Sequence, residues 1–143
     1  MRYQDGGAFR RALEQRLKNH SMQVAEKLHA FTRPHSSGES SRVKDFVDIL
    51  LLAELGTIDG ERLSRAIQAT FTAMGTHPIP TFLPDPPPEW HREFQSTRKN
   101  LGLENLTLAQ ASEIIGAFLD PVLKGELTGL WDPVSRTWNY AQS

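Results

Sequence analysis

Apolar residues recur every three or four positions along most of this 143-residue chain, which is the spacing of one face of an α-helix. The clearest segment covers residues 42–55, where the pattern is carried by Val43, Phe46, Val47, Leu50 and Leu51. Strands would instead alternate apolar and polar residues, and almost no segment does so. The periodicity therefore predicts an all-α fold, a multi-helix domain of about five helices.

N-cap residues, glycines and prolines set the expected helix ends and two irregular connections. The predicted helices cover residues 7–20, 22–31, 42–55, 60–74, 88–101 and 108–124, with N-caps at Ser40 or Ser41, Asp59 and Thr107 and helix-ending glycines at 56, 75 and 125. The Pro-rich stretch "THPIPTFLPDPPPEW" excludes regular structure and predicts an ordered crossing loop. The tail "LTGLWDPVSRTWNY" predicts a short hairpin or an irregular strap that packs Trp131 and Trp138.

Composition excludes several classes of protein. A net charge of −1 gives no global electrostatic reason to bind nucleic acid or an acidic membrane. The absence of cysteine excludes disulfides, thiolate zinc sites and cysteine nucleophiles. No apolar run approaches the roughly 20 residues of a membrane span, and the N-terminus has no signal-peptide pattern. We therefore expect a soluble, cytoplasmic protein that does not enter a membrane.

Common catalytic motifs are missing from the sequence. There is no Gly-rich phosphate loop, no His-Glu-x-x-His and no Gly-x-Ser-x-Gly. The five histidines are scattered, and no two of them have ligand spacing on one predicted helix. His29, His35 and His77 lie in or near predicted turns. We therefore predict no metal site.

Charged residues gather where two predicted helices meet. They are Lys27 and Arg33, with Thr32, at the end of one helix, and Arg42, Lys44 and Asp45 at the start of the next. Antiparallel packing would bring the four cations together beside a helix N-terminus, which favours a polyphosphate. Asp45 and Asp48 would then orient a cation or a metal-bound water. The alternative is that Asp45 complements the helix dipole while Arg42 and Lys44 are solvated.

These residues resemble two motifs of the AbiEii-type nucleotidyltransferase toxins of type IV toxin–antitoxin systems. The family's Lys-x4-Thr-Arg motif matches Lys27, Thr32 and Arg33, and its Arg-x-Lys-Asp motif matches Arg42, Lys44 and Asp45. The resemblance continues in order through "ATFTAMGTHPIPTFLPDPPPEW", "AFLDPVL" and the two tryptophans of the tail, so that it covers residues 23–138. It implies that Lys27, Arg33, Arg42 and Lys44 contact nucleotide phosphates and that Asp45 orients Lys44 or a metal-bound water. Magnesium, an NTP and an RNA acceptor such as tRNA are implied in the same way.

The resemblance also identifies a missing part. "RYQDGGAFRRALEQRL" resembles the family's opening helix, but Ser21 and Met22 adjoin where a catalytic sheet with Gly-Ser and Asp-x-Asp motifs should lie. The sequence has no Asp-x-Asp and no Gly-Ser. Nucleotidyl transfer requires carboxylate-held divalent metal. We therefore expect a shortened form with an opening helix at residues 1–21 and a helical C-terminal domain at 22–143, inactive in transfer on its own.

Two other functions remain open at this point. The chain is alternatively a helical interaction module that binds a cognate antitoxin, a full-length toxin or a second copy of itself. Loss of the catalytic sheet would then uncover the apolar faces of residues 22–31 and 46–55. The remaining hypothesis keeps full enzyme activity, with Asp45, Asp48 and a further carboxylate as the catalytic groups.

Overall fold

The structure is a computed structural model, and it describes residues 20–33, 39–83, 85–98, 103, 105–126 and 129–139. Residues 20–32 are helical, and the helices that follow are α2 (Glu39–Leu55), α3 (Gly60–Met74), α4 (His91–Thr97), which a short 3-10 helix η2 (Pro88–Trp90) precedes, and α5 (Leu108–Leu123). The helix predicted for residues 7–20 lies outside the described residues except for its last position.

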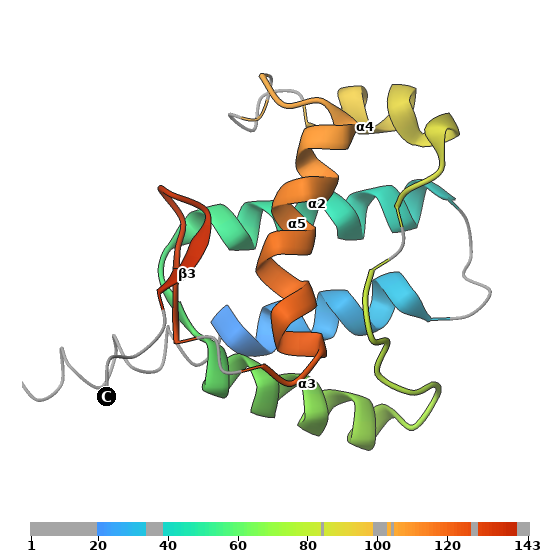
Figure 1. Ribbon diagram of the computed structural model, residues 1–143. Coiled ribbons are helices and arrows are strands. Elements are labelled where there is room, and N and C mark those ends of the chain that lie inside the picture. The colour runs from blue at the N-terminus through green and yellow to red at the C-terminus, as the bar shows by residue number, and fades with distance from the viewer. Residues whose placement is uncertain are drawn as a thin grey trace, which may run out of the picture.

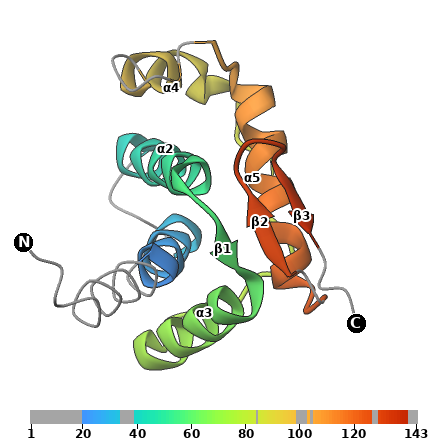
Figure 2. The same ribbon diagram turned by 90° about the vertical axis from the view of Figure 1, so that its left-hand side faces the viewer.

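The described helices form two layers. The helix at residues 20–32 lies between α2 and α3, and α5 crosses this layer on one side (Figure 1). In the perpendicular view, α4 lies beyond α2 at one end of the layer, and α5 lies along one side of the layer (Figure 2). The Pro-rich segment leads from the end of α3 to η2, as the crossing loop was predicted to do.

The all-α prediction overstates the helical character, because the described residues also contain a three-stranded antiparallel sheet. Its strands are β1 (Ile58–Asp59), β2 (Leu130–Asp132) and β3 (Thr137–Asn139), in the order β1-β2-β3. Trp131 pairs with both Ile58 and Trp138. The fold is therefore mostly helical with a small sheet. β1 escaped the sequence analysis because two residues are too few to show an alternating pattern.

The helices begin and end at the predicted N-cap residues and glycines, with one exception. Asp59 and Gly75 flank α3, and Gly75 adopts the left-handed conformation with φ of 62°. Thr107 caps α5 through a capping box with Gln110, in which each side chain accepts a hydrogen bond from the other residue's backbone. α2 instead begins at Glu39, so that Ser40 and Ser41 lie inside the helix rather than before it.

The C-terminal hairpin is fixed to the helices by its tryptophans. The indole N–H of Trp131, which is fully buried, donates to the Ala53 carbonyl at 2.8 Å. The indole N–H of Trp138 donates to the carbonyls of Ala117 and Phe118 at 3.1 Å. A buried indole usually has such a partner, and these bonds connect the hairpin to the end of α2 and to α5.

The apolar stripes of the central helices are covered. Val24, Leu28 and Phe31 of the first described helix are buried, and so are the apolar residues of α2 from Val43 to Ala53 that face the core. The expectation that these two faces lie open is therefore wrong for their core residues, although Met22 and Leu55 at the ends of the predicted faces are exposed. Within the same residues, none of the helices combines the length and hydrophobicity that a bilayer crossing requires.

Candidate functional site

The two motif-bearing helices pack antiparallel, so that the end of one lies at the start of the other. Arg42, near the start of α2, donates from Nη1 to the Phe31 carbonyl at 3.3 Å and from Nη2 to the Arg33 carbonyl at 2.6 Å. At the opposite ends of the helices, Nε2 of His20 donates to the Leu52 carbonyl at 2.7 Å. Arg42 therefore satisfies carbonyl groups that a helix C-terminus leaves without an internal partner.

Lys27 lies between two carboxylates of α2. Its Nζ atom is 2.9 Å from Oδ2 of Asp48 and 3.7 Å from Oδ1 of Asp45. The hydrogen bond to Asp48 is the main reason that the pKa of Lys27 is raised. Burial raises the pKa of Asp45 more than the neighbouring Lys27 lowers it. The ion pair of Asp45 is thus with Lys27, whereas Asp45 was expected to orient Lys44 or a metal-bound water.

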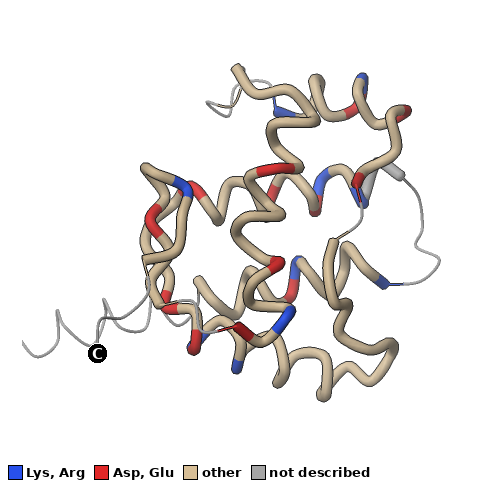
Figure 3. The backbone as a smooth tube through the Cα atoms, viewed as in Figure 1, with Lys and Arg blue, Asp and Glu red and all other residues tan. Residues whose placement is uncertain are grey.

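Arg33 and Lys44 carry the accessible positive charge of this junction. Both side chains are exposed, and among the described residues neither forms an ion pair. Lysines and arginines occur at the same end of the helix pair in Figure 3, where the helix at residues 20–32 ends and α2 begins. We call Arg33, Arg42 and Lys44 the junction cations. The structure thus links Arg42 to the backbone of Arg33, leaves Lys44 exposed two residues further along α2, and places Lys27 within its ion pairs.

A polar network beside the junction was missed by the sequence analysis. His29 and His77 have ring centroids 4.7 Å apart, although they lie on the first described helix and on the turn after α3. Hydrogen bonds connect His29 to Thr76 at 2.8 Å, Thr76 to His77 at 2.8 Å and His77 to Thr32 at 2.9 Å. No local spacing predicts this network, because it depends on how the Gly75 turn directs the chain back onto the helix.

The magnesium that the family resemblance implies finds no matching ligand set in the described part of the chain. No group of three or more histidine, aspartate or glutamate side chains converges there. Asp45 and Asp48 both face the Lys27 ammonium, so a cation between them would have to displace that lysine. Mg²⁺ requires octahedral oxygen ligands. The described residues therefore fit an anion at the junction better than a divalent cation.

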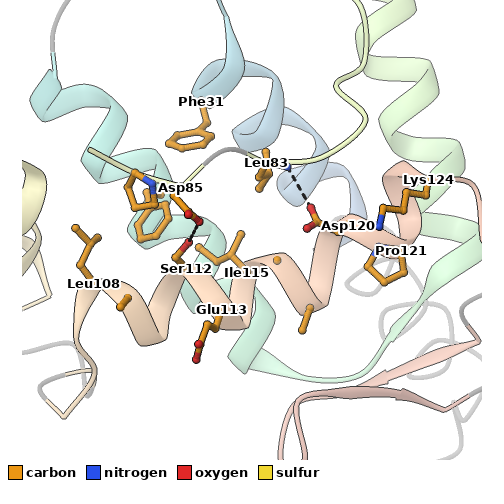
Figure 4. A pocket seen from close by; sticks show the side chains of 15 residues that line it. Phe31, Leu83, Asp85, Leu108, Ser112, Glu113, Ile115, Asp120, Pro121 and Lys124 are labelled. Carbon is orange, nitrogen blue, oxygen red and sulfur yellow. Dashed lines mark hydrogen bonds between the residues drawn. The ribbon is translucent and has the colours of Figure 1, made fainter. Parts of the chain in front are cut away.

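A groove of about 720 Å³ lies on the opposite side of Phe31, along α5 (Figure 4). Its apolar lining includes Phe31, Phe46, Leu83, Leu108 and Ile115, and its acidic lining is Asp85, Glu113 and Asp120. Two of the acids are held in place: Asp120 accepts from the Leu83 backbone N–H at 3.1 Å, and Asp85 accepts from Ser112 at 3.4 Å. The lining holds one basic side chain, Lys124. Its charge does not favour a phosphate.

Comparison with known proteins agrees with the motifs at the junction. The profile described as "Nucleotidyl transferase AbiEii toxin, Type IV TA system" matches residues 9–132, which is most of the chain. The class of protein is therefore a nucleotidyltransferase toxin of a type IV toxin–antitoxin system. The chain belongs to the AbiEii family of these toxins. No match was found among curated proteins or among solved structures.

The matched region passes through the point where the family's catalytic sheet was expected. Ser21 and Met22 are both helical, in the first described helix. His20 and Ser21, just before this point, are buried, and His20 is bonded to α2. Residues on both sides of the proposed boundary at 21–22 therefore pack as one continuous helix.

Proposed function

We propose that this chain retains the nucleotide-phosphate-contacting helical half of an AbiEii-family nucleotidyltransferase and does not transfer nucleotides on its own. The observation that carries the proposal is the double hydrogen bond from Arg42 to the Phe31 and Arg33 carbonyls. This bond fixes Arg33 beside the first turns of α2, where Lys44 is also exposed. A helix N-terminus with adjacent cations suits a phosphate ester.

Lys27 has a supporting place in this proposal. Its ammonium is shared between Asp45 and Asp48, so a phosphate that approaches it meets two carboxylates. We propose that Lys27 contacts a phosphate only together with the junction cations, while Arg33, Arg42 and Lys44 supply the main attraction. Asp45 then acts by holding Lys27, and a role for Asp45 on a metal-bound water would need ligands from outside the described residues.

The proposed absence of nucleotidyl transfer follows from the lack of carboxylates that could hold magnesium. The sequence has no Asp-x-Asp, and the Asp45–Asp48 pair is occupied by the Lys27 ammonium. Magnesium held by carboxylates aligns the attacking oxygen and stabilises the charge on the phosphoryl group. An NTP is therefore proposed as a ligand and not as a substrate, and an RNA end such as that of tRNA as a second ligand through its phosphates.

Titration calorimetry with ATP tests the phosphate site. We expect wild-type protein to bind ATP without magnesium and with an affinity that falls as salt rises. Arg33→Ala and Lys44→Ala should each weaken binding about tenfold, the lower end of the range for one hydrogen bond to a charged group. Arg62→Ala is the matched control, since Arg62 is an exposed cation on α3. No heat from wild-type protein, or an equal loss in the control, contradicts the proposal.

The groove favours a second candidate function, a helical interaction module. Its apolar floor and its acids at Asp85, Glu113 and Asp120 complement a protein segment that carries an apolar side chain between lysines or arginines. We propose a partner segment of that chemistry. Whether it belongs to an antitoxin, a full-length toxin or a second copy is decided by the experiment.

Light scattering tests association of the chain with itself, and co-purification with a co-expressed antitoxin or toxin tests the other partners. In each case Glu113→Lys should weaken the complex, because Glu113 lines the groove and is exposed. Glu61→Lys on α3 is the matched exposed control. A complex unaffected by Glu113→Lys, or a strictly monomeric protein that binds none of these partners, counts against the interaction module.

A further inference from the structure

The hydrogen bonds around His77 have a single consistent direction. The Thr32 hydroxyl donates its proton to the Leu28 carbonyl at 2.8 Å, since a carbonyl only accepts. The 2.9 Å contact between Thr32 and Nε2 of His77 therefore requires that His77 donate. A neutral His77 with a proton on Nε2 has a lone pair on Nδ1. The Thr76 hydroxyl, 2.8 Å from that atom, donates to it.

The direction of the hydrogen bond from His29 follows from that of Thr76. Because Thr76 has used its proton on His77, the 2.8 Å contact between Thr76 and Nε2 of His29 has the histidine as donor. The relay therefore runs from His29 through Thr76 and His77 to Thr32 and ends on the Leu28 carbonyl. Every donor and acceptor on this path is satisfied when both histidines are neutral and carry the proton on Nε2.

The ring environment agrees with a neutral His77. Burial lowers the pKa of His77 below its usual value, and the neighbouring His29 and Arg33 lower it further. The rings of His29 and His77 also pack edge-on against Phe71, with centroid distances of 5.0 and 5.1 Å. The network is thus built into the junction between the first described helix and the turn after α3.

We infer that His77 is a positioning residue for the proposed phosphate site, because it holds Thr32 and thereby the helix end that carries Arg33. Arg42 holds the Arg33 carbonyl from α2, while His77 holds the preceding side chain from the opposite element. Two anchors from different elements fix the backbone from which the exposed Arg33 side chain extends. A fixed starting point lowers the entropy that Arg33 loses when it binds a ligand. This inference rests on the proposed function.

Nitrogen-15 NMR of the histidine rings tests the relay without any ligand. At pH 8 we expect His77 to be neutral with its proton on Nε2 and His29 to carry a proton on Nε2, whereas His91, exposed at the first residue of α4, should show no preference for one ring nitrogen. A cationic His77, or a proton on its Nδ1, overturns the relay. A His77 ring that served only to fill space would show no preference for a proton on Nε2.

Calorimetry with ATP at pH 8 tests the positioning role. His77→Gln places an amide nitrogen near the position of Nε2 and should keep ATP affinity, whereas His77→Asn cannot reach Thr32 and should lower it about fivefold. Thr32→Val should produce a similar loss, and the double variant His77→Asn/Thr32→Val should lose no more than either single variant. His91→Gln is the control and should bind as the wild type does.

The outcomes of these experiments distinguish the positioning role of His77 from the phosphate site itself. Equal affinity of His77→Asn and wild-type protein, or additive losses in the double variant, overturns the positioning role and leaves the phosphate site standing. Failure of wild-type protein to bind ATP overturns the proposed function together with the positioning role, while the tautomer measurement still decides whether the relay exists.

Discussion

At the scale of single residues, Lys27 is the charge on which the two motif-bearing helices depend. Its ammonium is shared by Asp45 and Asp48, and its side chain is 38% exposed. Lys27→Met leaves both carboxylates without their cation, so we expect a loss of about 1 kcal/mol in the free energy of unfolding at neutral pH. Urea denaturation measures this loss. Lys44→Met, an exposed position on the same helix α2, should leave stability nearly unchanged.

The same ion pairs predict an alkaline pH dependence. The pKa of Lys27 is raised, chiefly by its hydrogen bond to Asp48, so the folded protein holds the proton more tightly than the unfolded chain does. This stabilisation is complete below the ordinary value of 10.5 and is lost as the pH rises through the folded-state pKa. As the pH is raised from neutral, the stability difference between wild type and Lys27→Met should therefore vanish only at strongly alkaline pH. A difference that vanishes near neutral pH contradicts the ion-pair assignment.

Arg136 combines an unfavourable backbone conformation with a favourable ion pair. Its φ is 59°, and its guanidinium forms two 3.0 Å hydrogen bonds to the Glu54 carboxylate. Both Arg136→Ala and Arg136→Gly lose the ion pair, but only glycine relieves the backbone. We expect Arg136→Ala to be less stable than Arg136→Gly by about 1 kcal/mol in thermal or chemical unfolding. Equal stability would show that the turn is not constrained at this residue.

At the scale of the elements, the hairpin is held to the helices by indole hydrogen bonds. Trp131→Phe removes the donor to the Ala53 carbonyl, whereas Trp90→Phe removes an indole N–H that has no partner among the described residues. Both variants lose the same atoms from buried positions. We therefore expect Trp131→Phe to cost about 1–3 kcal/mol more than Trp90→Phe in urea denaturation. A larger cost at Trp90 would contradict the role assigned to these bonds.

The helices were predictable from the sequence because each buries one face, and a buried face leaves a period of three to four residues. The second half of the chain illustrates this: Thr107 and the stripe that follows it predicted α5 almost to the residue. β1 was not predictable, since Ile58 and Asp59 become a strand only by pairing with Trp131 and Leu130, which are remote in sequence. Local pattern thus predicts elements that are stabilised locally, and it misses those that depend on a distant partner.

The same distinction applies to the candidate site. Lys27, Arg33 and Arg42 were predicted as site residues because each lies in one of the two motifs near the junction of the helices. The pairing of Lys27 with Asp48 and the link from His77 to Thr32 required the packing of separate elements. The histidines were set aside because their spacing on any single helix is wrong for a ligand. Their contact arises only after the turn at Gly75 brings the chain back.

At the scale of the whole molecule, the family membership and the chemistry of the chain point to different activities. The match over residues 9–132 places the chain among nucleotidyltransferase toxins, while its Asp45–Asp48 pair is occupied by Lys27 and its sequence lacks the Asp-x-Asp motif. The proposed phosphate site at the junction cations does not depend on those carboxylates. We therefore expect binding and transfer to be separable in this protein.

One assay with nucleoside triphosphates labelled at the α-phosphate tests that separation directly. The protein is incubated with each of the four labelled nucleotides, magnesium and tRNA, and the sample is divided between a filter-binding measurement and a denaturing gel. A competent nucleotidyltransferase in parallel shows that the RNA accepts nucleotides. The account predicts label retained by the protein, reduced by Arg33→Ala, and none in the RNA. Label in the RNA, or no retention by wild-type protein, would contradict it.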